Sequence, residues 1–404
     1  MTDLAQRRLL IVMAGRQYMK QKTFGENEPR PRFDYGELAQ TMARDGGWTV
    51  EVVDATTVET APSPVLRAAG RLLGTDAALA LRAIAARRRY DAVVTVGDQL
   101  AVWLAVGQRF LGERRPHLTT LIGVANAKKR LLHALTGFAD TLGLVLVHTE
   151  SERRTAATTF GIPADRVALV PLQVDQQWYR PSPRPPERPT VGAAGVEFRD
   201  YPTLVEAAAG LPGVRFLVNP QSPWSRKDPG ITADGLPANV ELRQLEVDGI
   251  RDFYDELTAV AVPLHENDTA AGLTAVLQGM AMGKPVICTR TSGRASVITD
   301  GVNGLLVDPG DVAGWRRAIS AVTADPTFAA RLGAEGRRWI ERHASMEHWV
   351  ARMREHIEAM GSASRRVPSA QSPFAGEAAA RPLPTGDGAF HAGAPQATVR
   401  SRFE

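Results

Sequence analysis

The run "LHENDTAAGLTAVLQGMAMGKPVICT", residues 264–289, contains a polar loop, a helix and a strand in one short segment. The small and apolar residues after Gly272 predict a helix, and Gly283 is placed to end it. The β-branched run "VICT" then predicts a buried strand, as does "TAVAVPL" immediately before the loop. A strand, a loop, a helix and a second strand make up the repeating unit of a parallel α/β sheet.

The same alternation extends in both directions along the chain. One series of apolar runs comprises "RLLIVMAG", "TVEVVDA", "DAVVTVG", "LTTLIGV", "LGLVLVHTES" and "RVALVPL", with helical stretches between them. A second series begins at "PTVGAAG" and continues through "VRFLVN", "TAVAVPL" and "KPVICTR". The segment between them, residues 176–190, is "QQWYRPSPRPPERPT", and its prolines cannot sustain a helix or a central strand. We therefore predict an α/β protein with two Rossmann-like doubly wound domains that face a central cleft.

Length and composition agree with two soluble domains. A chain of 404 residues is too long for one core, because single cores usually stop growing at about 250 to 300 residues. The apolar runs are of strand length, and the start "MTDLAQRR" has no long apolar segment behind it, so we expect neither a membrane span nor a signal peptide. The single cysteine, Cys288, excludes an intramolecular disulfide and a cysteine-cluster metal site. These features predict a cytoplasmic protein.

The net charge of +4 favours an anionic small ligand or an anionic surface as a partner. No helix-turn-helix or zinc-finger pattern is present, so we predict no nucleic-acid partner. Residues 361–404 are rich in Ala, Pro, Gly and Ser without periodicity, which predicts a disordered tail.

The predicted helix after Gly272 is a candidate anion site. Backbone N–H groups at the first turn of a helix have no intrahelical partner and lie at the positive end of the helix dipole. The small residues at 270–272 leave this backbone accessible to a phosphate. The alternative is that these small residues only allow the helix to pack closely on the sheet.

Several ordered motifs resemble the retaining GT-B glycosyltransferases of the group 1 type, glycosyltransferase family 4. The segment "AAGLTAVLQGMAMGKPVICTRTSGRASVITDGVNGLLVDPGD" is similar to the donor-binding region of that family, and the resemblance covers roughly residues 145–355. It implies a nucleotide-sugar donor, retention of anomeric configuration, no metal and no other cofactor. The acceptor stays unknown.

The resemblance also implies domain limits. It places an N-terminal acceptor domain at residues 1–175, a linker at 176–190 and a C-terminal donor domain at 191–345. The run "HWVARMREHIEAM" is similar to the last helix of the family, so residues 346–360 are expected to cross back to the first domain.

The family motifs are only partly preserved in the expected donor site. The Glu-x7-Glu pair of the family falls on Ala270 and Gln278, and its Arg-x4-Lys pair falls on Ala194 and Arg199. Gln278 retains an amide that can both donate and accept a hydrogen bond. The residues that the resemblance assigns to catalysis are Arg199 and Glu266, and those that it assigns to donor binding are Gly272, Leu273, Thr274, Gln278, Asp268, Arg243 and Leu245.

In the retaining reaction of this fold, the acceptor attacks from the face that the diphosphate leaves, and the departing phosphate takes the proton. Catalysis then consists of positioning and of stabilising charge on the phosphate. Two alternatives stay open. The first is a degenerate relative that binds a nucleotide sugar or a partner without turnover, and the second is another double-Rossmann sugar enzyme such as an epimerase.

Residues 65–90 combine leucines with several arginines. This pattern is typical of a helix that lies on anionic lipid, which makes a peripheral membrane contact one candidate partner. A surface helix that packs its apolar stripe on the sheet gives the same pattern.

Overall fold

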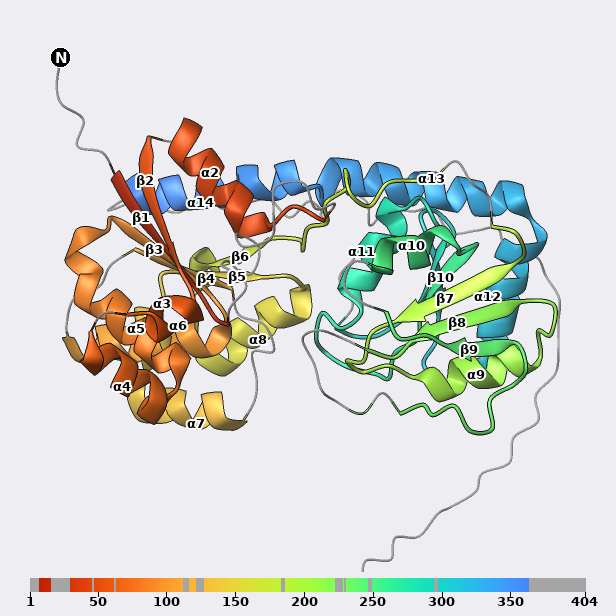
Figure 1. Ribbon diagram of the computed structural model, residues 1–404, viewed down its shortest axis with the longest axis horizontal. Coiled ribbons are helices and arrows are strands. Elements are labelled where there is room, and N and C mark those ends of the chain that lie inside the picture. The colour runs from red at the N-terminus through yellow and green to blue at the C-terminus, as the bar shows by residue number, and fades with distance from the viewer. Residues whose placement is uncertain are drawn as a thin grey trace, which may run out of the picture. The chain divides into compact units, whose positions relative to one another are not determined.

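The structure is a computed structural model that describes residues 7–15, 30–45, 47–61, 63–111, 116–120, 127–182, 186–221, 228, 230–245, 249–293 and 297–362. It contains two parallel sheets of six strands each, with helices on both faces of each sheet (Figure 1). The predicted α/β class with two doubly wound sheets is therefore confirmed. The expected tail lies outside the described residues from position 363 onward.

The first sheet has the strand order β2-β1-β3-β4-β5-β6. Its strands are β1 (Arg7–Met13), β2 (Trp48–Val53), β3 (Ala92–Val96), β4 (His117–Thr120), β5 (Leu144–Val147) and β6 (Val167–Leu169). The α-helices described with it are α2 (Asp34–Asp45), α3 (Ala55–Glu59), α4 (Pro64–Leu73), α5 (Thr75–Ala86), α6 (Asp98–Leu111), α7 (Ala127–Thr136) and α8 (Glu150–Phe160). Short 3-10 turns occur at Arg87–Arg89, Phe138–Thr141 and Ala164–Arg166.

Strand β1 is buried on both faces. Leu9, Ile11 and Met13 join the core cluster on one face of the sheet, and Leu10 and Val12 join the cluster on the other. Successive side chains of a strand point to opposite faces, so a strand that is covered on both sides is a continuous apolar run. This accounts for the sequence "RLLIVM".

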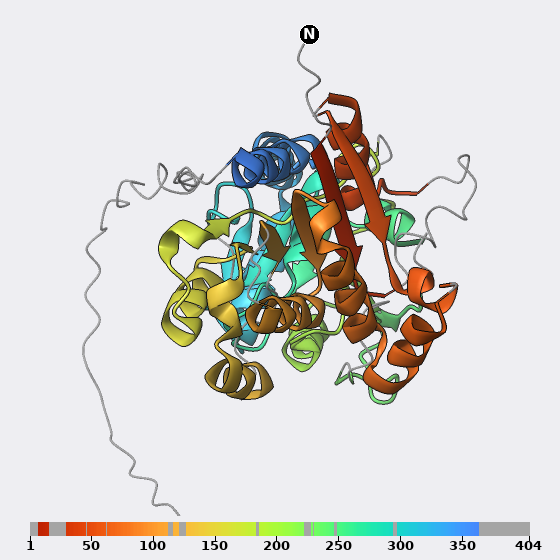
Figure 2. The ribbon, with the colours of Figure 1, turned by 90° about the vertical axis from the view of Figure 1, so that its left-hand side faces the viewer.

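The last helix, α14 (Met346–Ser362), packs against the first sheet. Trp349, Met353 and Ile357 belong to the same buried cluster as Leu9 and Ile11. Figure 2 shows α14 and α2 on one side of this sheet, with α4 to α6 on the other. The domain limits implied by the resemblance remain a prediction, and this packing agrees with the expected place of residues 346–360.

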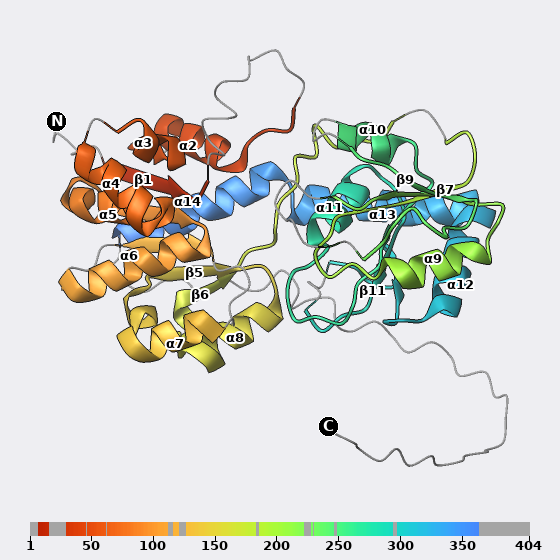
Figure 3. The same ribbon diagram turned by 60° about the horizontal axis from the view of Figure 1, so that its bottom comes forward.

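The second sheet has the order β12-β11-β10-β7-β8-β9. Its strands are β7 (Thr190–Ala194), β8 (Arg215–Asn219), β9 (Val240–Leu242), β10 (Ala259–Val262), β11 (Val286–Thr289) and β12 (Leu305–Val307). Its helices are α9 (Tyr201–Ala209), α10 (Ile250–Asp255), α11 (Leu273–Ala281), α12 (Val312–Ala324) and α13 (Pro326–His343), and they are labelled in Figure 3. One core cluster joins Ala193, Phe216 and Ala261 of the sheet to Tyr201 of α9 and Trp315 of α12.

Helix limits follow the expected capping chemistry. The side chain of Asp325 accepts a hydrogen bond from the N–H of Phe328 at the start of α13, and Pro326 occupies the first turn. Gly283 has a φ of +67° just after α11, as the Gly-Lys-Pro sequence predicts. The Lys284 ammonium then donates to the carbonyls of Asp255 and Leu257, which fixes the turn into β11.

None of the described helices combines the length and the apolar character that crossing a bilayer requires.

His117 is the first residue of β4 and belongs to the core of the first sheet. Its side chain is fully buried, and its Nε2 lies 2.8 Å from the Thr95 hydroxyl. Burial lowers the pKa of His117 to about 4, because no buried charge compensates an imidazolium there.

We expect the free energy of unfolding to fall between pH 6.5 and 4, because the unfolded histidine takes up a proton more readily than the buried one. His117→Gln should flatten this part of the stability profile, by up to about 3 kcal/mol. The measurement is urea denaturation at a series of pH values. Thr95→Val is the control, since it removes the hydrogen-bond partner without removing a titrating group. An equal slope in wild type and His117→Gln would contradict the assignment.

Candidate functional site

The carboxyl ends of β7 and β10 mark a switch point in the second sheet. These two strands are neighbours, and the chain continues from β7 to β8 on one side and from β10 to β11 on the other. Open parallel sheets bind ligands where the connections diverge in this way. The loops after β7 and β10 contain Arg199, Glu266, Asp268 and Gly272, four of the residues predicted for the site.

The two loops are joined by backbone hydrogen bonds. The N–H of Asp200 donates to the carbonyl of Pro263 at 3.2 Å, and the N–H of His265 donates to the carbonyl of Phe198 at 2.9 Å. Phe198 has a φ of +54°, the only positive value at a described residue other than glycine. Strained backbone of this kind persists only where the surroundings enforce it. The paired loops therefore hold the site in one conformation.

Arg199 is the central cation of this region. Its side chain is buried, with Nε and Nη2 donating to the carbonyl of Ala194 at 3.0 and 2.8 Å and Nη1 donating to the carbonyl of Glu197 at 3.0 Å. Among the described residues no carboxylate forms an ion pair with it. Arg199 is thus a buried charge that is hydrogen-bonded but not neutralised.

Gly272 places the start of α11 against this guanidinium. It has a φ of +79° and precedes the helix without any side-chain cap. A Cβ at this position would lie 2.7 Å from Val262 Cγ1 and 3.4 Å from Arg199 Nη1. The positive end of the helix and the guanidinium therefore lie side by side, and both favour an anion.

Leu273 and Thr274 form the first turn of α11. The Leu273 side chain is buried and its N–H donates to the carbonyl of Ala270 at 3.2 Å, whereas Thr274 is exposed. Close packing on the sheet occurs farther along the helix, where a Cβ on Gly279 would lie 3.0 Å from Val260 and from Val286. Small residues thus have two roles in this segment. Gly279 allows the helix to pack closely on the sheet, and the small residues at 270–272 leave the start of the helix accessible.

Glu266 is exposed and ionised. Its Oε1 accepts hydrogen bonds from the backbone N–H of Ser292 at 2.8 Å and from the Ser292 hydroxyl. These bonds hold the pKa of Glu266 below its usual value. Asp268 is exposed two residues later, and Asn267 between them is buried and accepts from the N–H of Thr269. Because its lowered pKa keeps Glu266 ionised at neutral pH, Glu266 is suited to accept hydrogen bonds and not to donate a proton.

The amide of Gln278 is held by two tyrosines. Its Nε2 donates to the Tyr179 hydroxyl at 2.9 Å, and its Oε1 accepts from the Tyr254 hydroxyl at 3.0 Å. The residue that stands at the second glutamate of the family motif is therefore built into a contact between α11, α10 and the segment before β7.

Arg243 and Leu245 lie after β9. The Arg243 guanidinium donates to Glu241 at 2.9 Å and to Glu256 at 2.7 Å, and these carboxylates raise its pKa. Leu245 is half-buried. No hydrogen bond or ion pair among the described residues joins either one to Arg199 or to the start of α11, and their place in the donor site stays a prediction.

Asn219 is a candidate that the sequence prediction omitted. It ends β8, it is buried, and its Oδ1 has no hydrogen-bond partner among the described residues. Its backbone carbonyl accepts from the N–H of Gly195, in the loop that holds Arg199. A buried acceptor without a partner is costly. The signal in the sequence is the polar residue at the end of the apolar run "RFLV".

A second polar cluster lies in the first domain, where Gln173 Nε2 donates to a carboxylate oxygen of Asp34 and the N–H of Tyr35 donates to the other at 2.7 Å. Burial raises the pKa of Asp34 to about 6. Nearby, Arg32 pairs with Asp175 at 2.8 Å and with Glu347 at 3.0 Å. Asp34 and Tyr35 lie at the first turn of α2, and Gln173 and Asp175 lie after β6.

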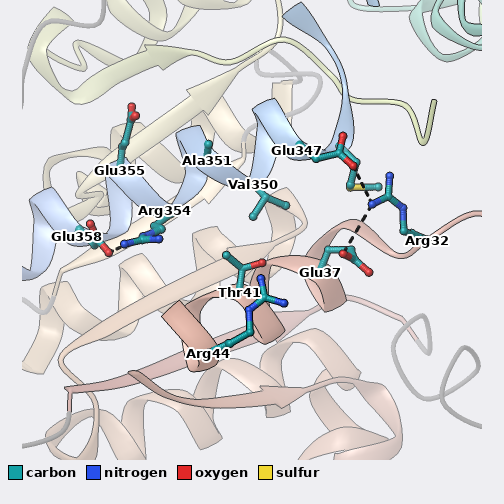
Figure 4. Close-up of a pocket in the computed structure, with 11 residues that line it drawn as sticks. Arg32, Glu37, Thr41, Arg44, Glu347, Val350, Ala351, Arg354, Glu355 and Glu358 are labelled. Atoms are coloured by element: carbon teal, nitrogen blue, oxygen red, sulfur yellow. Dashed lines mark hydrogen bonds and ion pairs between the residues drawn. The ribbon is translucent and has the colours of Figure 1, made fainter. Parts of the chain in front are cut away.

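A cavity of about 520 Å³ lies between α2 and α14 in the part of the chain that the structure describes (Figure 4). Its arginines are paired with neighbouring carboxylates, Arg32 with Glu347 and Arg354 with Glu358. Because these charges neutralise one another, we assign the anion site to the α11 terminus and not to this groove.

The described residues also contain no group of three or more His, Cys, Asp or Glu side chains that could hold a metal ion.

Gly272→Ala should destabilise the protein by about 2 to 4 kcal/mol, because it adds a clash with Val262 to the cost of a left-handed alanine. Gly301→Ala is the matched control, since Gly301 has a φ of +72° but nothing within 4 Å of its Cβ position. We expect this control to cost only about 1 kcal/mol. Equal losses in chemical denaturation would show that the contact with Val262 has no effect.

Comparison with known proteins finds that parts of this chain are similar to glycosyltransferases. The family description "Glycosyl transferases group 1" matches residues 200–325. The lipopolysaccharide core biosynthesis glycosyltransferase LpsE of Rhizobium meliloti is 32% identical over 166 residues, which cover 40% of this chain and 48% of that protein. The D-inositol 3-phosphate glycosyltransferase of Xylanimonas cellulosilytica is 27% identical over 249 residues, covering 56% and 58%. The chain thus spans about half the length of these curated relatives.

Solved structures match over more of the chain. A glycosyltransferase from Rickettsia africae superposes with a TM-score of 0.64 at 14% identity and covers 88% of this chain and 99% of its own. Anabaena HepE, in complex with UDP and glucose, superposes with a TM-score of 0.64 at 16% identity, covering 86% and 99%. At these identities the likeness establishes the fold. The chain has the GT-B fold, and its residues 200–325 match the family description of the group 1 glycosyl transferases.

Proposed function

We propose that the protein transfers a sugar from a nucleoside diphosphate donor to an acceptor, with the donor diphosphate at the N-terminus of α11 beside Arg199. The observation that carries this proposal is the buried guanidinium of Arg199, which has no carboxylate partner among the described residues. A buried charge without a counterion costs several kcal/mol, and here the positive helix end adds to that cost. A bound diphosphate supplies the missing negative charge.

The chemistry expected of this arrangement is stabilisation of a leaving phosphate. Arg199 and the free N–H groups of α11 are fixed before the donor binds, so they need no reorganisation as charge builds on the diphosphate. Retention of configuration and independence from metal belong to the same proposal. In that reaction the acceptor oxygen bonds to the anomeric carbon on the face that the phosphate leaves, and the phosphate oxygen receives the acceptor proton.

Glu266 is assigned to the sugar. Because its carboxylate is ionised, it accepts hydrogen bonds from sugar hydroxyls or stabilises positive charge at the anomeric carbon. Asn219 is a further candidate for donor contact through its unpartnered Oδ1. Arg243 and Leu245, which no hydrogen bond or ion pair among the described residues joins to the start of α11, remain predicted donor-binding residues.

The proposal places the acceptor on the first domain and the enzyme in the cytoplasm, with a peripheral membrane contact. It uses the domain limits 1–175 with 346–360, 176–190 and 191–345. The UDP and UDP-glucose complexes of Anabaena HepE make a uridine nucleotide the first donor to test.

A binding-only protein is the second candidate. Ala194 and Ala270 replace a cation and a carboxylate of the family motifs, and Gln278 is occupied by Tyr179 and Tyr254. These substitutions remove polar groups from the donor side, so nucleotide binding without turnover is the outcome that would favour this candidate.

Nucleotide binding can be tested by thermal unfolding with UDP, GDP, ADP and dTDP. A ligand at 100 times its dissociation constant stabilises the native state by about 2.7 kcal/mol, so one nucleotide should clearly raise the melting temperature. Arg199→Ala should abolish the ligand-induced rise, and Arg199→Lys should keep part of it because the charge remains.

The control for this experiment is Arg338→Ala, on α13, which removes an exposed arginine paired with Glu335. Since Arg199 also ties the loop together, the quantity compared is the shift caused by the ligand and not the melting temperature itself. A rise that persists fully in Arg199→Ala would contradict the assignment of the diphosphate to this site.

Turnover can be tested by release of nucleotide from the donor that binds. Glu266→Gln should lower this rate on the order of a hundredfold while leaving the nucleotide-induced thermal shift in place, because the carboxylate is assigned to the sugar. Glu206→Gln, which removes an exposed carboxylate on α9, is the matched control. Equal rates in wild type and Glu266→Gln would exclude Glu266 from catalysis.

A further inference from the structure

Exposed apolar side chains are concentrated on one set of helices in the first domain. The described residues expose eleven large hydrophobic side chains, and nine of them lie on α4, α5, α6 and α7. These nine, which we call the apolar helix face, are Val65, Leu72, Leu73, Leu81, Trp103, Phe110, Leu111, Leu131 and Leu135. Soluble proteins rarely leave such a group of apolar side chains exposed, so we expect the apolar helix face to contact a partner.

Three of the four helices pack in a row. A Cβ on Gly70 of α4 would lie 3.9 Å from Ala78 of α5, and a Cβ on Gly107 of α6 would lie 2.1 Å from Ile84 of α5. Figures 1 and 3 show α4, α5 and α6 side by side on one side of the first sheet. The turn that follows α7 is bonded to α6, since the Thr141 hydroxyl donates to the carbonyl of Ala105 at 2.9 Å. The helices that carry the apolar helix face are therefore neighbours in the first domain.

The exposed side chains repeat with the period of a helix. Val65 and Leu72 are seven residues apart on α4, as are Trp103 and Phe110 on α6, and Leu131 and Leu135 are four apart on α7. Such spacing places each pair on one side of its helix. Their exposed fractions reach 83% at Leu72 and 75% at Phe110. These stripes point away from the core that the same helices cover.

Helix α4 decides between the two interpretations of residues 65–90. Helix α5 buries Ala77, Leu79 and Ala83, as a helix that packs on a sheet should. Helix α4 has no fully buried residue, and only Leu66 and Ala69 pack against the core cluster that α5 joins. Packing thus explains α5 and one side of α4, and it leaves the exposed side of α4 with Val65, Leu72 and Leu73 unexplained.

The charges around the apolar helix face are mainly positive. Residues 64–111 contain seven arginines and three aspartates, and α7 contains Lys128, Lys129 and Arg130 without an acidic residue. Two of the aspartates have partners, since Asp98 forms an ion pair with Lys129 and Asp91 accepts from the N–H of Arg8. Arg71, Arg109 and Arg130 are exposed beside the apolar stripes. A cationic border complements an anionic surface.

We propose that the apolar helix face docks the protein peripherally on an anionic lipid surface. The apolar side chains enter the boundary between headgroups and acyl chains, Trp103 lies at the level of the headgroups, and the arginines contact lipid phosphates while their stems cover apolar surface. This contact gives the peripheral membrane partner of the proposed function a defined surface. It uses no residue of the donor site, so each proposal can fail without the other.

The test is sedimentation of the full chain with vesicles of phosphatidylcholine alone and with about one third phosphatidylglycerol, at low and high salt. We expect binding to the anionic vesicles only, weakened at high salt. The double variant Leu72→Ser with Phe110→Ser and the double variant Arg71→Glu with Arg130→Glu should each reduce binding about tenfold or more. All four side chains are exposed, so these variants should keep the wild-type melting temperature.

The matched controls lie in the second domain. Val302→Ser removes another exposed apolar side chain, and Arg342→Glu reverses another exposed arginine, so both should bind vesicles as the wild type does. The proposal is overturned if the wild type does not bind anionic vesicles or if the controls lose as much binding as the variants. It is also overturned if light scattering finds a dimer that Leu72→Ser with Phe110→Ser dissociates, since a second copy then covers the face. An unchanged nucleotide-induced thermal shift in all variants would confirm that the donor site is intact.

Discussion

The position of Arg199 beside the start of α11 fixes how the loops after β7 and β10 are arranged in the second domain. A guanidinium is buried against the positive end of a helix, at the point where the loops after β7 and β10 are joined. Three of its N–H bonds go to the carbonyls of Ala194 and Glu197, which satisfy hydrogen bonding but provide no net negative charge. Only glycine fits at position 272, because its left-handed φ and the closeness of Val262 both exclude a side chain. In the proposed site, the donor diphosphate would supply the negative charge that these carbonyls do not.

The changes in the family motifs are understandable in these terms. Where a glutamate would stand, Gln278 joins Tyr179 and Tyr254, and its amide suits this role because it donates to one hydroxyl and accepts from the other. A carboxylate there could only accept, and it would be partly buried between two phenols. Ala194 is buried at the end of β7, and its backbone carbonyl serves Arg199 twice. In this chain Ala194 and Gln278 thus bond to Arg199 and to two tyrosines, in place of the ligand contacts that the family motif implies.

The sequence alone predicts the parts of this structure that depend on local patterns. Apolar runs buried on both faces identify the strands, and Gly272 and Gly283 give the limits of the helix in the opening stretch, because a φ above zero favours glycine. What the sequence cannot predict depends on partners far along the chain. The bond from Gln278 to Tyr179 spans 99 residues, and the orphaned oxygen of Asn219 is defined only by the packing around β8. For α4, the period of the apolar residues is the same whether the stripe faces the core or the solvent.

Polar residues in the interior of this protein differ in how their charge is compensated. His117 is neutral and paired with Thr95, and its lowered pKa reflects a core that excludes charge, so its role is structural. The hydrogen bonds of Arg199 go to backbone carbonyls and leave its charge uncompensated, which is the argument for an anion in the proposed donor site. Asp34 is half-buried, and burial raises its pKa to about 6, with Gln173 and a backbone N–H as its partners. Arg199 and Asp34 both lie in connections at the carboxyl edge of a parallel sheet, where α/β proteins bind their ligands. Of the two, only Arg199 lacks a partner that compensates its charge or a proton that removes it, so the case for a bound anion is made at Arg199.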